Sequence, residues 1–239
     1  MVRRLLPLAV ALFLAGTAGA HDHPAAGNNA AKGDYAKIWL ERQQNAPRLA
    51  VAARFDDTGR LWLARVVGQQ LYVSQSSDAG RSFSEAVAVN REPELISADG
   101  EARPQIAAIG RRIYVSWTQA LPQPFAGYIR LAVSDDGGKT FGEPVTVNDD
   151  TQPITHRFNA MLADAQGVTL TWIDKRDGTG HPDYTGAAIY TARSTDSGRS
   201  FDINRKLADH SCECCRIAIA ADSDGMPEIG RASCRERVS

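Results

Sequence analysis

The chain has 239 residues, a hydrophobic fraction of 43% and a formal net charge of −1 at pH 7. This length allows one large or two small domains, and the composition is that of an ordinary globular protein. No basic stripe occurs along the sequence, so nothing in it indicates a nucleic-acid partner.

Residues 1–20 have the features of a secretory signal peptide. Arg3 and Arg4 form a positively charged start, residues 5–15 form an apolar run, and residues 18–20 form a small-residue cleavage site. The apolar run is too short to span a bilayer as a stable helix. We therefore expect an exported protein, periplasmic or secreted, with no transmembrane segment after cleavage.

The next segment, residues 21–34, is small and polar, and we expect it to be flexible. Cleavage after residue 20 would make His21 the first residue and His23 the third. The free amine, two backbone amides and the imidazole of the third residue can form a square-planar Cu(II) site. The alternative is a flexible end that carries histidines by chance. Residues 35–40 are short and apolar enough to form a strand.

Short runs rich in β-branched or aromatic residues, bounded by Gly, Asp or Pro, follow through most of the chain. Such runs are typical of strands, and we expect no helix after the signal peptide. The predicted strands are 49–53, 61–67, 71–76 and 86–89, then 105–109, 113–118, 128–134 and 145–147, then 158–163, 168–173, 188–193 and 203–207, and finally 216–220.

One eight-residue stretch, Ser-x-Asp-x-Gly-x-(Ser/Thr)-Phe, occurs three times. Its defining residues are Ser76, Asp78, Gly80 and Phe83, then Ser134, Asp136, Gly138 and Phe141, then Ser194, Asp196, Gly198 and Phe201. Asp and Gly at these positions are typical of a hairpin turn, in which Asp accepts backbone N–H groups and Gly takes a positive φ. The aspartates are 58 and 60 residues apart, so each repeat corresponds to one supersecondary unit.

These repeats resemble the Asp boxes, or bacterial neuraminidase repeats, of the sialidase-like β-propellers, over residues 48–227. The resemblance implies an all-β propeller, which has six four-stranded blades in that family. Residues 35–229 would then form about three and a half blades, at 47–90, 102–148, 156–208 and, incomplete, 215–229, and the strand at 35–40 would complete the last blade of the ring. Residues 230–239 break the pattern and resemble cloning-vector read-through, so we expect a fragment of a protein that is monomeric at full length.

Antiparallel connectivity divides the predicted propeller into two faces. The turns between first and second strands and between third and fourth strands lie on one face, together with the Asp boxes. The remaining loops and the crossovers between blades lie on the other face, and long loops on a rigid scaffold are the usual place for functional sites.

An arginine opens the innermost strand of every predicted blade. These residues are Arg48, Arg103, Arg157 and Arg216, at separations of 55, 54 and 59 residues. Guanidinium groups that converge near the propeller axis would require an anion, and arginine suits fork-like pairing with a carboxylate or phosphate. The alternative is that each arginine pairs with a structural carboxylate of a neighbouring blade.

The family resemblance implies that these arginines bind an acidic sugar. Sialidases hold the carboxylate of their acidic sugar with an arginine triad, and use a Tyr paired with Glu as nucleophile and a loop Asp as acid/base. The chain departs from their Arg-Ile-Pro motif at Arg48-Leu49-Ala50, and the nearest match is Arg103-Pro104. The Tyr–Glu pair is expected in the half of the propeller that this chain lacks.

The loop at residues 174–186 supplies the candidate catalytic residues Asp174, Asp177 and Tyr184. A carboxylate beside the arginines would stay ionised in their positive field and could act as an acid/base group. The alternative is a solvated polar loop without a catalytic role.

The crossover into the fourth blade carries His210, Cys212, Cys214 and Cys215. In an extended segment the side chains of His210, Cys212 and Cys214 share one face, and imidazole with thiolate suits Cu(I) or Zn(II). The alternatives are a disulfide, which an oxidising compartment favours, or a free thiol. Without Cys234 the mature chain has three cysteines, an odd number for an exported protein.

Two functions follow from these residues. The first is an exo-α-sialidase-type glycosidase acting on an acidic sugar. The second is a non-catalytic exported propeller that binds a ligand or a copper or zinc ion through the same face. No cofactor is certain from the sequence.

Overall fold

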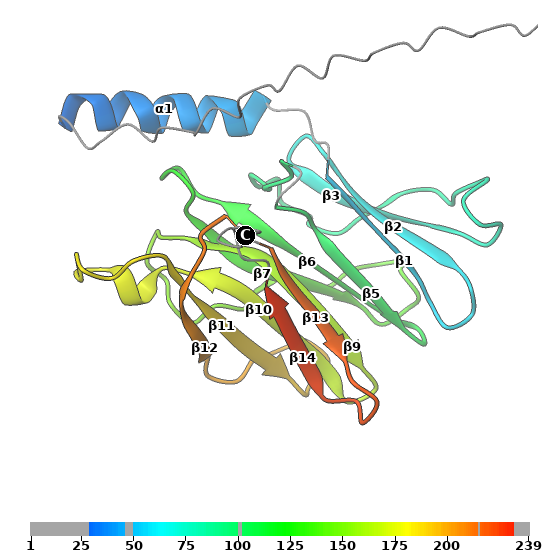
Figure 1. The fold of residues 1–239 in the computed structure, drawn as a ribbon. Coiled ribbons are helices and arrows are strands. Elements are labelled where there is room, and N and C mark those ends of the chain that lie inside the picture. Colours follow the sequence, from blue (N-terminus) through cyan, green and yellow to red (C-terminus); the bar gives the residue numbers. More distant parts are fainter. Residues whose placement is uncertain (1–28, 46–49, 100–101, 215, 232–239) are drawn as a thin grey trace, which may run out of the picture.

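The computed structural model describes residues 29–45, 50–99, 102–214 and 216–231. It contains three four-stranded antiparallel sheets and one two-stranded sheet (Figure 1). In each sheet the strands follow chain order from the inside outwards, and the inner strand of each sheet contacts the inner strand of the next. The prediction of an all-β, partial β-propeller is therefore confirmed.

The strand bounds follow the predicted repeats closely. The first blade has β1 (Val51–Phe55), β2 (Leu61–Val67), β3 (Gln70–Ser76) and β4 (Val87–Ala88), and the second has β5 (Gln105–Ile109), β6 (Arg112–Ala120), β7 (Gly127–Ser134) and β8 (Val145–Thr146). The third has β9 (His156–Asp164), β10 (Gly167–Asp174), the short 3-10 helix η1 (Arg176–Gly178), β11 (Ala187–Ser194) and β12 (Arg205–Ser211), and β13 (Ile217–Ala221) pairs with β14 (Pro227–Arg231).

The predicted bounds of the last strand in the third blade are wrong. The last strand of the third blade lies at Arg205–Ser211 rather than 203–207, because Ile203 is 82% exposed and does not join the sheet. His210 therefore belongs to β12 and not to a crossover. The strand β14 runs through Gly230 to Arg231, and residues 232–239, most of the predicted read-through segment, lie outside the described residues.

From residue 29 onwards, the prediction of flexible chain to residue 34, a strand at 35–40 and no helix is wrong. Residues Asn29–Asn45 form the helix α1. This stretch is rich in Ala, Lys, Glu, Gln and Arg, which favour helix, and a helix pairs its own backbone groups without a neighbouring strand. Among the described residues no helix is both long and apolar enough to cross a membrane. Residues 21–28, with His21 and His23, lie outside the described residues.

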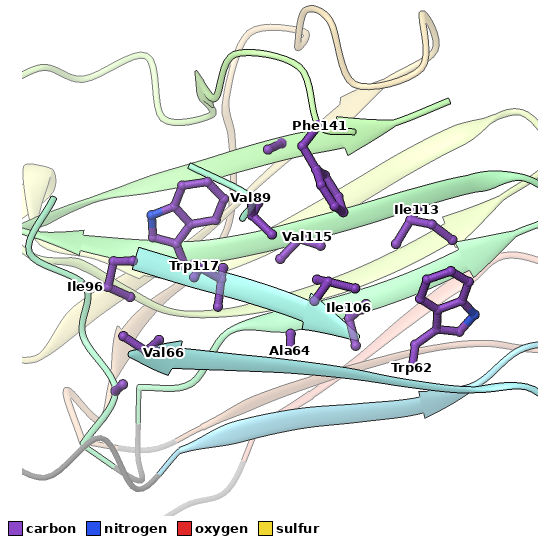
Figure 2. Packing of buried hydrophobic residues seen from close by; sticks show 14 of the residues in the cluster. Trp62, Ala64, Val66, Val89, Ile96, Ile106, Ile113, Val115, Trp117 and Phe141 are labelled. Atoms are coloured by element: carbon purple, nitrogen blue, oxygen red, sulfur yellow. The ribbon is translucent and has the colours of Figure 1, made fainter. Parts of the chain in front are cut away.

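The hydrophobic core lies between the blades. Trp62 of β2, Ile106 of β5, and Val115 and Trp117 of β6 belong to one cluster of buried side chains that joins the first blade to the second (Figure 2). A second cluster joins the second and third blades, and a third joins the third blade to β13 and β14. Burial of each large apolar side chain stabilises the fold by about 1.5–3 kcal/mol, so adjacent blades depend on one another for stability.

The Asp boxes form closely similar hydrogen-bonded turns. In the first box Ser76 Oγ accepts a hydrogen bond from Gly80 N at 2.8 Å and donates one to Asp78 Oδ1 at 2.7 Å. Asp78 also accepts hydrogen bonds from the backbone and hydroxyl of Ser82, at 2.9 and 2.6 Å. The side-chain hydrogen bond from Ser82 and that from Ser76 lower the pKa of Asp78 to about 2. The aspartates of the other two boxes accept corresponding bonds from Thr140 and Ser200.

Replacement of Gly138 by alanine should lower the free energy of unfolding by about 1–3 kcal/mol. An added Cβ would lie 2.7 Å from Trp62 Cζ3, and the backbone φ of +79° is strained for alanine. The control is Gly137→Ala in the same turn, where φ is +80° but no heavy atom lies within 4 Å of the added Cβ. Urea unfolding should show a clearly smaller loss for this variant. Equal losses would show that contact with Trp62 does not matter.

The first Asp box should also contribute to acid sensitivity. Because the folded-state pKa of Asp78 is about 2, below its ordinary 3.8, its contribution to stability is complete above pH ~4 and is lost as the pH falls through 2. The melting temperature of Asp78→Asn should therefore fall less steeply than that of the wild type over this range. Asp57→Asn, in the exposed β1–β2 turn, is the control and should behave like the wild type.

Candidate functional site

The inner strands begin at one end of the propeller and the Asp boxes lie at the other. Ile109 ends β5 and pairs with Arg112, whose Nε lies 2.7 Å from Asp135 Oδ1 in the second Asp box. The residues before Gln105 therefore lie at the opposite end from the box. We call the end at which β1, β5, β9 and β13 begin the upper face; α1 lies across it (Figure 1).

A cavity of about 560 Å³, here called the central cavity, is lined by the four inner strands β1, β5, β9 and β13. Backbone and small side chains form most of its wall. Arg103 lines its upper end, just before β5, whereas Arg54 near the end of β1 lines it toward the Asp boxes. Both arginines are exposed, so each presents a guanidinium group at one end of the cavity.

The structure brings only one of the described candidate arginines to this cavity. Arg157 is buried and Arg216 is exposed, and neither lines the central cavity. Arg48 lies outside the described residues. Neither Arg157 nor Arg216 therefore converges with Arg103 at the central cavity. For Arg157 the reason is that its side chain packs against other groups.

Arg157 pairs with a structural carboxylate, as in the alternative interpretation of the four arginines. Its Nη2 lies 3.1 Å from Asp99 Oδ2, a carboxylate in the segment between the first two blades. Burial lowers the pKa of Arg157, while the charge of Asp99 acts in the opposite direction. The guanidinium carbon lies 4.8 Å from the ring centroid of Phe158, 5.6 Å from that of Phe125 and 5.9 Å from that of Trp39 in α1. These contacts hold α1 on the upper face.

Asp174, a candidate acid/base group, is fully buried at the end of β10. Its Oδ2 accepts hydrogen bonds from Trp172 Nε1 at 2.8 Å and from Arg176 Nε and Nη2 at 3.0 and 2.8 Å. Burial acts to lower the pKa of Arg176, but hydrogen bonds and the charges of Asp174 and Asp149 outweigh it and raise the pKa. Asp174 thus orients Arg176 and does not face the central cavity.

Asp177 and Tyr184 lie in a separate hollow. This hollow, of about 460 Å³, is lined by Asp177, His181, Asp183, Tyr184, Lys206, Asp209 and His210, and shares no residue with the central cavity. Asp177 accepts a hydrogen bond from Tyr190 Oη at 3.0 Å, and Tyr184 donates one to Asp209 at 2.9 Å. Burial, followed by the hydrogen bond to Asp209, raises the pKa of Tyr184, which keeps the phenol protonated.

The cysteine segment is partly described. The sulfur atoms of Cys212 and Cys214 lie 3.0 Å apart, and Cys215 lies outside the described residues. The His210 ring stacks on Tyr184 at 4.8 Å, and its Nδ1 is 2.9 Å from the Thr185 carbonyl. Within the part of the chain that the structure describes, His210 and these cysteines do not form a three-ligand cluster. A copper or zinc site here stays a prediction.

Two buried groups of the upper face were not predicted. Glu94, between the first two blades, accepts a hydrogen bond from Trp117 Nε1, and burial raises its pKa. His156 opens β9 beside Arg157 and is fully buried. Neither residue belongs to a repeated motif, so no signal in the sequence distinguishes them.

Replacement of Asp174 by asparagine should destabilise the protein by about 2–3 kcal/mol, because it weakens several hydrogen bonds and leaves the charge of Arg176 less well paired. Asp177→Asn is the control, since its side chain is 24% exposed and pairs with Lys206 at the surface. Urea unfolding of both variants tests this difference. An Asp174→Asn variant with unchanged stability and no turnover would instead indicate a catalytic role.

Comparison with known proteins finds similar folds among solved structures only. No protein-family model and no curated protein sequence matches the chain significantly. An α-L-arabinanase of Penicillium chrysogenum, solved with arabinobiose, is 13% identical at a TM-score of 0.55, over 79% of this chain and 59% of that one. The arabinofuranosidase Arb93A of Fusarium graminearum, an E242A mutant with an iminosugar inhibitor, is 14% identical at 0.52, over 72% and 52%.

The NanB sialidase of Streptococcus pneumoniae is 13% identical over 74% of this chain and 26% of that one. Its TM-score of 0.47 is too low to support an argument about the fold. The chain spans little more than half the length of the two arabinan enzymes. Identities this low describe the fold alone. Four-stranded antiparallel sheets with Asp-box turns give the described residues a partial β-propeller fold, which is similar to the folds of the two arabinan enzymes.

Proposed function

We propose that the full-length protein is an exported, glycosidase-type propeller that binds an acidic sugar on its upper face. The observation that carries this proposal is the central cavity, which all four inner strands line and which has Arg103 at its upper end. Solved structures with this fold include an arabinanase in complex with arabinobiose and an arabinofuranosidase with an iminosugar. These matches favour a carbohydrate ligand, and an exo-α-sialidase type of hydrolysis is the finer form of the proposal.

The preference for an acidic sugar rests on Arg103. A guanidinium group pairs with a carboxylate through two parallel hydrogen bonds, a geometry that a neutral sugar does not offer. Arg157 contributes to the site indirectly, because it is buried against Asp99 and the aromatic rings that fix α1. The anion contact is therefore assigned to Arg103.

A second candidate is a propeller that binds the same ligand without hydrolysing it. The specific observation in its favour is that Asp174, Asp177 and Tyr184 are all engaged in hydrogen bonds away from the central cavity. Among the described residues, none of the three could reach a sugar there without breaking these bonds. In the glycosidase proposal, the nucleophile then comes from outside this chain's described part.

The test uses the full-length protein with Arg103→Ala and, as matched control, Arg54→Ala, which alters the other end of the same cavity. Loss of one charged hydrogen-bonded contact should weaken binding of a sialoside or uronoside by about 10- to 150-fold. Arg54→Ala should bind like the wild type, and neutral arabinosides should be bound equally by both variants. Calorimetry gives the affinities and release of a chromogenic aglycone gives turnover.

Binding with turnover, lost in Arg103→Ala alone, supports the glycosidase. Binding without turnover supports the non-catalytic propeller. If the folded full-length protein neither binds nor hydrolyses any acidic sugar, or if Arg103→Ala has no effect on binding, the proposed ligand class is wrong.

A further inference from the structure

We propose that Asp150, His156 and Asp174 form a binding site for one divalent transition-metal ion, with zinc as its best-fitting member. The three residues come from the segment after β8 and from strands β9 and β10, so the site joins the second blade to the third. One imidazole nitrogen and two carboxylate oxygens all lie within 4.8 Å of one another. The site is independent of the central cavity and of the cysteine segment.

The orientation of the His156 ring identifies the coordinating atom. Nδ1 lies 2.8 Å from the carbonyl oxygen of Gly127, which can only accept a hydrogen bond. Nδ1 therefore carries a proton, and in the neutral ring Nε2 presents a lone pair. A backbone carbonyl that fixes the far nitrogen in this way is typical of metal-binding histidines.

Two atoms at the centre of the cluster lack hydrogen-bond partners among the described residues. These are His156 Nε2 and Asp150 Oδ2, and both are buried. His156 is fully buried, and the side chain of Asp150 is 12% exposed. An unsatisfied buried polar group costs about 1–3 kcal/mol, and native proteins contain few of them. A metal ion between two such facing atoms would satisfy both of them.

The spacing of the atoms fits an ion better than a shared proton. His156 Nε2 lies 3.6 Å from Asp150 Oδ2 and 3.7 Å from Asp174 Oδ2. Hydrogen bonds between nitrogen and oxygen span about 2.7–3.2 Å, so a proton on Nε2 would reach neither oxygen well. Two ligands bonded to one zinc ion at about 2.0–2.2 Å in tetrahedral geometry lie about 3.3–3.6 Å apart.

The charges around the cluster also favour a cation. Asp149, Asp150 and Asp174 bring three carboxylates together, and Arg176 contacts two of them. One guanidinium group leaves two negative charges uncompensated, and a divalent ion would balance them. Hydrogen bonds from Arg176 and Trp172 to Oδ2 hold the Asp174 side chain in place beside His156. His156 and Asp174 are cross-strand partners, which fixes their side chains on one face of the sheet.

The donor set indicates which ion binds. Calcium and magnesium prefer sites made of oxygen ligands alone, whereas an imidazole with two carboxylates suits zinc and its neighbours in the first transition series. The partial exposure of Asp150 marks the side from which the ion would enter.

The experiment measures Zn²⁺ binding to the full chain in a background with all four cysteines, Cys212, Cys214, Cys215 and Cys234, replaced by serine, so that thiolates contribute nothing. Calorimetric titration of chelator-treated protein should give one zinc ion per chain and a rise in melting temperature. The Co²⁺ form should show d–d absorption typical of nitrogen and oxygen ligands. Each readout is independent of any catalytic activity.

Asp150→Asn and His156→Gln should each weaken zinc binding at least about tenfold and abolish the zinc-dependent rise in melting temperature. Asp149→Asn is the matched control, because it removes a neighbouring charge that binds Arg176 but not a coordinating atom. It should retain the stoichiometric zinc ion. If His156→Gln does not fold, Asp150→Asn alone tests the zinc site. This variant should fold, since an amide replaces a carboxylate with almost no change in volume.

Zinc bound by the serine background and by Asp149→Asn but not by Asp150→Asn supports the site. A folded serine background that binds no zinc overturns it. Equal zinc binding by Asp150→Asn and Asp149→Asn also overturns it.

Discussion

The contact between apolar faces of neighbouring blades is the interaction on which the rest of the structure depends. A four-stranded sheet cannot shield both of its faces, so each blade buries side chains such as Trp62 and Trp117 only against the next blade. The same packing places the four inner strands side by side around one cavity. It also brings the segment after β8 against β9 and β10, where Asp150 meets His156 and Asp174. The upper face and both proposed sites are thus consequences of how the blades stack.

The two ends of the propeller differ in how their polar groups are paired. At the Asp-box end, hydroxyl and carboxylate groups satisfy tight turns, and the pKa of Asp78 is lowered because its carboxylate accepts several hydrogen bonds. At the upper face, a buried polar atom such as His156 Nε2 lacks a hydrogen-bond partner among the described residues, and Arg103 lines the upper end of the central cavity. Arg157 belongs to neither class, because Asp99 and three aromatic rings surround it.

Local features of the fold could be predicted from the sequence, and features that depend on distant contacts could not. The Asp-box spacing predicts the blades because hairpin turns depend on a few adjacent residues, and β2 and β5 lie where predicted. The helix α1 replaces the predicted ring-closing strand, because the helical propensity of the segment outweighs its short apolar run. Connectivity predicts which face the arginines share, but only packing decides that Arg103 reaches the cavity and Arg157 does not. The cluster at His156 joins three separate segments, so no spacing reveals it.

The glycines of the later Asp boxes have a consequence for how the polypeptide matures. Gly138 of the second box lies against Trp62 of the first blade, and Gly198 of the third box lies against Leu131 and Val133 of the second. Each of these turns therefore closes onto a sheet that was synthesised earlier. Blades can therefore be added in order of translation, because each new Asp-box hairpin packs against a sheet that has already formed.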